Sequence, residues 1–193
     1  MKKFFAAVFA CVMGISSLFA GDVEDVKAVI LKDMEAGAQG KFAECLPLRT
    51  PDYVEVCESG EFTYEHMRWT VLAMDGDHPE EFLLMLLVIR TNGKLQLTPD
   101  IRARVSEAAR APEFIENYKA SIGKLAAMLQ ADQKLQLKTT KFVSVDIDGD
   151  SATVVGEYDS NASGSIVHKT ATVTLRKVNG AWKISKAVIE TKK

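Results

Sequence analysis

Histidine and cysteine are scarce in this chain, which has three of each among its 193 residues. His66, His78 and His168 have no ligand-like spacing, and the thiols are too few to complete a zinc site. No other group of side chains has the pattern of a catalytic set. We therefore expect no metal site and no cofactor, and the sequence identifies no catalytic residues.

The chain also lacks an excess of positive charge. Its 24 basic and 26 acidic residues give a formal net charge of −2. Lys2 and Lys3 lie in the first twenty residues, so the remainder has 22 − 26 = −4. Nucleic acids and anionic lipid surfaces are bound by clustered Lys and Arg, which makes both poor candidates for partners.

Long apolar runs are absent except at the start of the chain. Lys2 and Lys3 precede the mostly apolar segment Phe4–Phe19, and the small residue Ala20 follows it. This is the pattern of a secretory signal peptide, and the segment is short for a membrane-spanning helix. We expect cleavage near Ala20, a periplasmic or secreted protein, and no integral membrane association afterwards.

Cys45 and Cys57 are the two cysteines outside that segment. In an oxidising compartment they can form a disulfide that closes a short loop, which is typically worth about 3 kcal/mol. The alternative is a pair of small buried thiols, because a residue at a helix end and one several positions along a strand lie at different heights. The sequence leaves both alternatives open.

The first half of the chain has mainly helical periodicity. Apolar residues from Val23 to Met34 and from Tyr64 to Met74 recur every three or four positions, with Thr63 as a cap for the second helix. Between them, residues 52–58 alternate as a strand does. Residues 77–134 are predicted to be almost wholly helical, with Asp77 and Glu80 spaced as a capping box and new helices after Thr98 and Pro112.

The last sixty residues change to the periodicity of strands. Four segments rich in Val, Ile and Thr are separated by turn residues, including Asp148-Gly149 and Asn179-Gly180. Such pairs are strong signals for β-hairpins. The predicted strands form an antiparallel meander and cover residues 137–147, 152–159, 166–178 and 182–189. With the helices, they indicate an α+β fold.

This order of elements resembles the nuclear transport factor two-like superfamily, which includes polyketide cyclases and steroid isomerases. The matching parts are Thr50–Glu55 followed by Gly60, and the closing segment Asn179–Ile184 with Trp182. The resemblance implies a single domain over residues 21–193. In it, a curved antiparallel sheet wraps the N-terminal helices as a cone, a cystatin-like roll with an apolar pocket at its open end. Residues 77–134 are then a helical insertion that caps or fills the mouth.

Polar residues near the mouth of such a cone are candidates to line the pocket. Tyr158 and its neighbour Asp159 point to opposite faces of a strand, whereas Tyr53 and Glu55 share a face. Which face looks inward is not decided by the sequence. The candidate pocket residues are Tyr53, Glu55, His66, Trp69, Tyr158 and His168.

Three functions are compatible with this pattern. A non-catalytic module that binds a small apolar or amphipathic ligand is preferred, because the fold favours a pocket and no catalytic set is present. The alternatives are an isomerase- or cyclase-like enzyme with a pocket carboxylate or histidine, and a structural scaffold with a filled pocket. Phe82–Ile89 is apolar on every side, which is typical of a core helix, although a homodimer contact or a lid would also use it.

Overall fold

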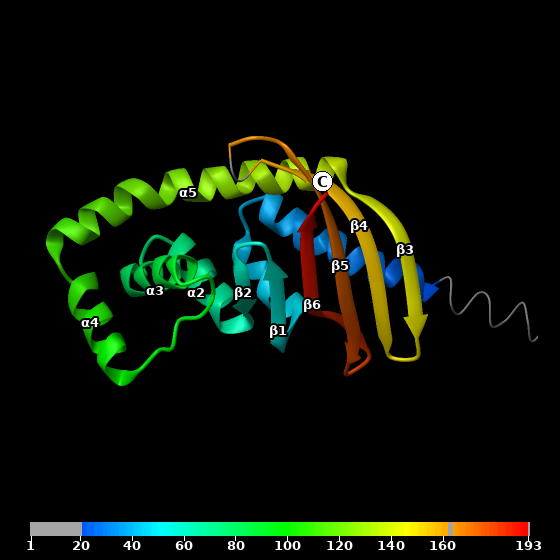
Figure 1. Cartoon of the computed structure of the whole chain (residues 1–193), viewed down its shortest axis with the longest axis horizontal. Helices are drawn as coiled ribbons and strands as arrows, with labels where there is room; N and C mark the ends of the chain where they lie inside the picture. The colour runs from blue at the N-terminus through cyan, green and yellow to red at the C-terminus, as the bar shows by residue number, and fades with distance from the viewer. Residues whose placement is uncertain (1–20, 162–163, 193) are drawn as a thin grey trace, which may run out of the picture.

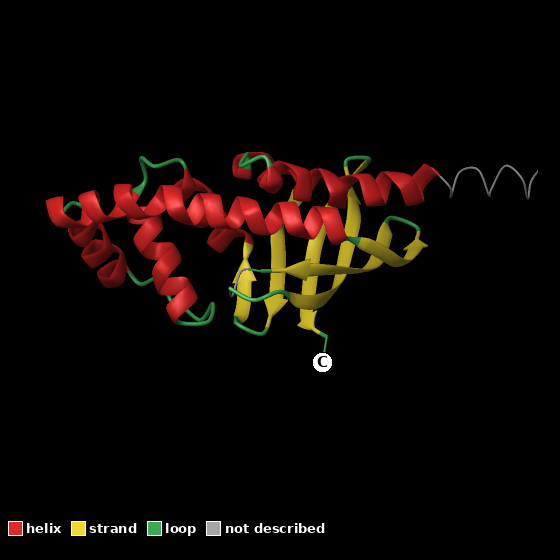
Figure 2. Ribbon diagram, turned by 90° about the horizontal axis from the view of Figure 1, so that it is seen from above, coloured by secondary structure: helices red, strands yellow, loops and turns green. Residues whose placement is uncertain are grey.

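The computed structural model describes residues 21–161 and 164–192, which form an α+β fold. The predicted signal peptide lies outside the described residues. Figures 1 and 2 show a curved sheet at one end of the molecule and a group of helices at the other. The long helix α5 (Pro112–Thr139) runs from the helical group along the sheet.

The strands pair in the order β2-β1-β6-β5-β4-β3. The hairpins are antiparallel, but β1 pairs with β6 in parallel, so the prediction of a wholly antiparallel sheet was wrong. The two strands lie at opposite ends of the sequence and are joined by a long connection, which a parallel pair requires. The strands are β1 (Arg49–Cys57), β2 (Gly60–Thr63), β3 (Lys141–Asp148), β4 (Ser151–Ser160), β5 (Val167–Val178) and β6 (Ala181–Thr191).

The two predicted turns connect strands of the meander. Gly149 lies between β3 and β4 with φ +58°, and Asn179 and Gly180 lie between β5 and β6 with φ +52° and +79°. Tight hairpin turns require this left-handed backbone, which Gly and Asn adopt at low cost. The meander predicted from these residues is confirmed.

The helices differ from the prediction at one end. Residues 21–38 are helical, and α5 continues to Thr139, so β3 begins at Lys141 rather than at Leu137. Tertiary contacts favour the longer helix, because the Thr139 hydroxyl accepts a hydrogen bond from the Asp159 backbone at 2.9 Å. The other helical elements are η1 (Phe42–Leu48), α2 (Tyr64–Met74), α3 (Pro79–Arg90) and α4 (Pro99–Ala109).

The caps of the helices were predicted in part. Thr63 caps α2, where its hydroxyl accepts a hydrogen bond from the His66 backbone, and Thr98 caps α4 in the same way. The capping box expected of Asp77 and Glu80 is absent, because α3 begins after His78, which makes no side-chain cap. Pro79 in the first turn fixes that start, since it needs no hydrogen bond from its nitrogen.

The core is divided between the sheet and the helical insertion. Val26 and Ile30 of the N-terminal helix pack against Leu175, Trp182 and other buried residues of the sheet. Two further clusters lie among α2, α3, α4 and α5, one around Phe82 and Tyr118 and the other around Trp69. The insertion therefore has a core of its own. Within the described residues, no helix is both long and apolar enough to cross a membrane.

Candidate functional site

Two neighbouring cavities, which have several lining residues in common, occupy the space between the sheet and the helices. The inner chamber, of about 270 Å³, lies between the N-terminal helix and the sheet. The outer chamber, of about 740 Å³, lies between the end of the sheet, η1, α2 and α3. The helical insertion therefore lines the mouth of the cone, with Met85, Val88 and Leu129 in the wall of the outer chamber.

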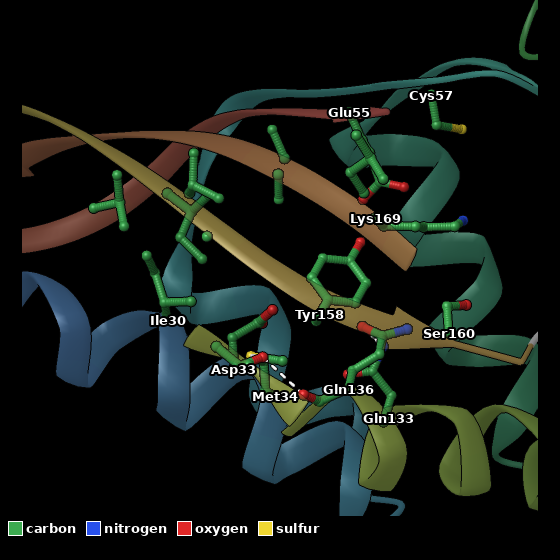
Figure 3. A pocket seen from close by; sticks show the side chains of 18 of the residues that line it. Ile30, Asp33, Met34, Glu55, Cys57, Gln133, Gln136, Tyr158, Ser160 and Lys169 are labelled. Carbon is green, nitrogen blue, oxygen red and sulfur yellow. Dashed lines mark hydrogen bonds between the residues drawn. The ribbon is translucent and has the colours of Figure 1, made fainter. Parts of the chain in front are cut away.

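Away from the wall that they share, both chambers have many apolar lining residues, and the inner chamber also has Asp132, Gln136 and Thr140. Ile30, Met34, Phe142, Val154, Val173 and Ile184 line the inner chamber. The outer chamber has Phe42, Phe62, Met67, Val71, Met85 and Val88. The residues that line both chambers are all polar, and we call this set the polar collar: Asp33, Arg49, Glu55, Cys57, Gln133, Ser160 and Lys169. Figure 3 shows most of them around the inner chamber.

A buried ion pair anchors the collar. The Arg49 side chain is 8% exposed and makes a bidentate contact with the Asp33 carboxylate, with N–O distances of 2.5 and 2.8 Å. A third hydrogen bond, of 2.9 Å, joins the guanidinium to the Cys45 carbonyl. Burial alone would lower the pKa of Arg49, but the Asp33 carboxylate, together with Tyr53 and Cys45, outweighs burial and raises it. The guanidinium is therefore charged and fixes the N-terminal helix to the start of β1.

Tyr53 and Glu55 form a second polar contact beside this pair. The buried Tyr53 hydroxyl donates a hydrogen bond of 3.0 Å to the Glu55 carboxylate, and the Arg49 guanidinium lies 5.1 Å from the centre of the Tyr53 ring. Burial, followed by the charge of Glu55, raises the pKa of Tyr53 well above its ordinary value. The phenol therefore stays protonated and keeps donating to Glu55.

Tyr158 and Lys169 lie on neighbouring strands at the same wall. They are directly paired in the register of β4 and β5, and both line the inner chamber. Figure 3 shows the two side chains projecting from their strands toward the cavity. Burial raises the pKa of the Tyr158 hydroxyl, and the Glu55 charge adds to this effect. The hydroxyl therefore remains a hydrogen-bond donor at neutral pH.

The structure brings three of the predicted pocket residues together. Tyr53, Glu55 and Tyr158 all line the inner chamber. His66 lies in the wall of the outer chamber, where its Nδ1 accepts a hydrogen bond from the Thr63 backbone and burial lowers its pKa.

The other two predicted residues lie elsewhere. Trp69 is buried against α3 and α4 and lines neither chamber, although its ring lies 5.4 Å from that of His66. His168 is exposed on the outer face of the sheet, where its Nδ1 lies 2.8 Å from the Asp159 carboxylate. The alternation that directs Tyr158 inward directs Asp159, and its neighbour His168, outward.

Of the charged collar residues, sequence reasoning found Glu55 but missed Asp33, Arg49 and Lys169. Asp33 and Arg49 are 16 positions apart on different elements, so no local pattern joins them. The position of Lys169 was predictable from the sequence, because Lys169 alternates with Ala171, Val173 and Leu175, which face the core or the chamber. A lysine in the inward register of a strand is a candidate pocket residue.

Cys45 and Cys57 are free thiols, so the disulfide considered from the sequence is not formed. They lie near opposite ends of β1. The Cys45 thiol donates to the Asp33 carbonyl at 3.4 Å, and Cys57 lies 3.0 Å from the Ser59 hydroxyl. Burial, followed by the Asp33 charge, raises the pKa of Cys45 to about 12. No group of three or more His, Cys, Asp or Glu is placed to hold a metal ion in the part of the chain that the structure describes.

We expect the two thiols to differ sharply toward an aromatic disulfide reagent at pH 8. The half-buried Cys57 reacts in the native protein, whereas Cys45 reacts at least about 1,000-fold more slowly because little thiolate is present. Absorbance of the released thiolate measures both rates in protein that begins at Gly21. Cys57→Ser should abolish the fast phase. Rapid reaction of Cys45 in that variant, or no free thiol in denaturant, would contradict the arrangement described above.

No family model matches the sequence, and no curated protein matches it. Solved structures do resemble the chain in fold. One is an NTF-2-like protein of unknown function from Silicibacter pomeroyi, with 11% identity over 90% of this chain and 98% of that one and a TM-score of 0.47. An NTF2-like protein with a cystatin-like fold from Novosphingobium aromaticivorans is 10% identical over 93% of this chain and 87% of that one, with a TM-score of 0.47.

A ketosteroid isomerase-like protein from Erwinia carotovora atroseptica is 10% identical over 88% of this chain and 95% of that one, with a TM-score of 0.43. At such identities the likeness concerns the fold alone and does not extend to function. The names of these structures are those of the nuclear transport factor two-like superfamily, which the sequence also resembles.

Proposed function

We propose that this protein is a non-catalytic binding module for a small apolar or amphipathic ligand. The observation that carries the proposal is the pair of neighbouring chambers, each with many apolar lining residues, that share the polar collar. The outer chamber, of about 740 Å³, lies within the range of ~300–1,000 Å³ that is typical of small-molecule sites. A few polar groups in an apolar cavity are also the usual composition of such sites.

The cavities argue against a scaffold filled by its own side chains. Residues of α3 and α5 line the outer chamber and leave it open beside the collar. In a scaffold filled by its own side chains, we would not expect polar side chains around an internal space, because unpaired polar groups are costly to bury. Secretion through the predicted signal peptide is part of the proposal, since it sets the compartment from which the ligand comes.

An isomerase- or cyclase-like enzyme is the second candidate. Glu55 and the Tyr158 hydroxyl line the same chamber, and such chemistry needs a carboxylate base facing a hydrogen-bond donor. However, the Tyr53 hydroxyl already donates to Glu55 at 3.0 Å, so this carboxylate is engaged by a residue of the protein itself. The binding module is therefore the better supported of the two.

Native mass spectrometry of protein purified from its own compartment tests the proposal. We expect a reproducible small-molecule mass that is lost on denaturation. Val167→Trp places a large side chain in the outer chamber and should lower ligand occupancy at least about tenfold, since apolar pockets reject added bulk. Val143→Trp is the matched control, because Val143 is 59% exposed and lines neither chamber.

Two results would overturn the binding proposal. One is a protein at its bare mass that also fails to take up added amphipaths. The other is equal occupancy in the unaltered protein and the Val167→Trp variant, which would place the ligand outside the chambers.

A further inference from the structure

Lys169 is a collar cation without a counter-ion. Its side chain is half-buried and lines both chambers, yet it forms no ion pair or hydrogen bond with any residue of 21–161 or 164–192. The other charges of the collar are engaged, because Arg49 pairs with Asp33 and Glu55 accepts from Tyr53. Lys169 therefore presents an ammonium without a partner among the described residues, in a collar whose two acidic and two basic residues balance in charge.

A second unused donor lies beside this lysine. The Tyr158 side chain is buried, and its hydroxyl makes no hydrogen bond within the described part of the chain. Residues paired directly across two antiparallel strands have Cβ atoms about 4.5–5.5 Å apart, so Tyr158 and Lys169 can contact one ligand group together. Figure 3 shows the hydroxyl and the lysine on the same side of the chamber.

An ammonium and a hydroxyl side by side match the two oxygens of a carboxylate. One oxygen accepts a charge-assisted bond from Lys169 and the other a bond from Tyr158. A group with two negative charges fits less well, because Glu55 and Asp132 line the same chamber and the charges of both reach Tyr158. The collar therefore favours a singly charged anionic head.

The apolar part of the ligand has room in the outer chamber. That chamber is the larger of the two and is lined by Phe62, Met67 and Val88 beyond Lys169. We infer that the protein binds a long-chain carboxylate, with its head held between Lys169 and Tyr158 and its chain in the outer chamber. This inference rests on the proposed function, for which it names the ligand class.

Calorimetric titration with decanoate and with 1-decanol at pH 8 tests the inference. We expect decanoate to bind more tightly than the alcohol. Lys169→Met keeps the length of the side chain but removes its charge, and should weaken decanoate binding at least about tenfold while changing 1-decanol binding less than about twofold. Tyr158→Phe should weaken decanoate binding about fivefold. Lys186→Ala is the control, because Lys186 is exposed and lines neither chamber.

The other results separate the two proposals. Equal binding of both compounds, unaffected by Lys169→Met, would overturn the carboxylate inference and leave the binding module standing. Equal weakening of both compounds by Lys169→Met would also overturn it, because the lysine would then act through packing. Failure of decanoate to bind the unaltered protein would overturn the carboxylate inference, and failure of both compounds would also count against the binding module. Binding of 1-decanol alone would show the head to be uncharged. Glu55→Gln should strengthen decanoate binding, and a weakening would place the head elsewhere.

Discussion

Asp33→Ala is expected to lower the free energy of unfolding by about 3–5 kcal/mol. The substitution leaves the Arg49 guanidinium, which is 8% exposed, without its carboxylate partner. Without Asp33, the guanidinium remains buried with only its hydrogen bond to the Cys45 carbonyl, so the penalty exceeds the worth of the ion pair itself. Urea unfolding at pH 7, with the slope held to the value of the unaltered protein, measures the change.

Two further variants control this measurement. In Asp33→Leu with Arg49→Met both charges are replaced by apolar groups, and the double variant should lie within about 1 kcal/mol of the unaltered protein, because no charge is left unpaired. Glu65→Ala breaks the Glu65–Arg68 pair, in which both side chains are nearly half exposed, and should cost less than about 1 kcal/mol. If Asp33→Ala costs no more than Glu65→Ala, the pair does not hold the collar together.

The buried pair explains why the collar can present an unused charge. Asp33 lies on the N-terminal helix and Arg49 begins β1, so their contact fixes the helix to the sheet at the wall that the two chambers share. Because the Asp33 carboxylate is bound to Arg49, it does not pair with Lys169 on β5, and the lysine ammonium stays available to a ligand in the cavity. The polar groups of the site are thus divided into a structural pair and a group open to ligand.

The parts of the fold that depend on neighbouring residues were predictable from the sequence. Gly149 and Gly180 mark hairpins because a tight turn needs left-handed backbone at those positions, and Thr63 marks the start of a helix for an equally local reason. The parallel pairing of β1 with β6 and the end of α5 depend on contacts between distant segments. Their sequences carry no mark of those contacts.

The candidate site shows the same division. Alternation along a strand placed Tyr53 with Glu55 and separated Tyr158 from Asp159, but the direction of each face is set by the N-terminal helix that packs on the sheet. Trp69 was misplaced because α3 and α4 form a separate core around it. Local patterns therefore fix which side chains share a face, whereas tertiary packing decides which face meets the cavity.

At Gly60 and Gly93, a local backbone requirement and a contact between distant segments occur together. Gly60 begins β2 and Gly93 follows α3, and each has a positive φ. The sequence did not indicate that the two turns meet. A Cβ atom on Gly60 would lie 2.2 Å from the Asn92 carbonyl oxygen. A Cβ atom on Gly93 would lie 1.7 Å from the Glu61 carbonyl oxygen. The turn after α3 is thus packed directly on β2, the outer edge of the sheet.

Gly93→Ala is therefore expected to lower the free energy of unfolding by about 3 kcal/mol or more, through left-handed strain together with a clash against backbone. Gly180→Ala is the matched control, because its φ of +79° is close to the +78° of Gly93 and a Cβ there meets nothing within 4 Å. The control should cost only the strain, about 1–2 kcal/mol.

Urea unfolding of both variants separates the clash from the strain. Hydrogen exchange in α3 should also accelerate in Gly93→Ala alone, since the turn that fixes the end of α3 against β2 must move. Val88 and Ile89 at that end line the outer chamber, so the displacement would open the chamber and weaken ligand binding with the collar intact. Equal losses of stability in the two variants would show that the turn yields freely, and that α3 is held by its own core rather than by the sheet.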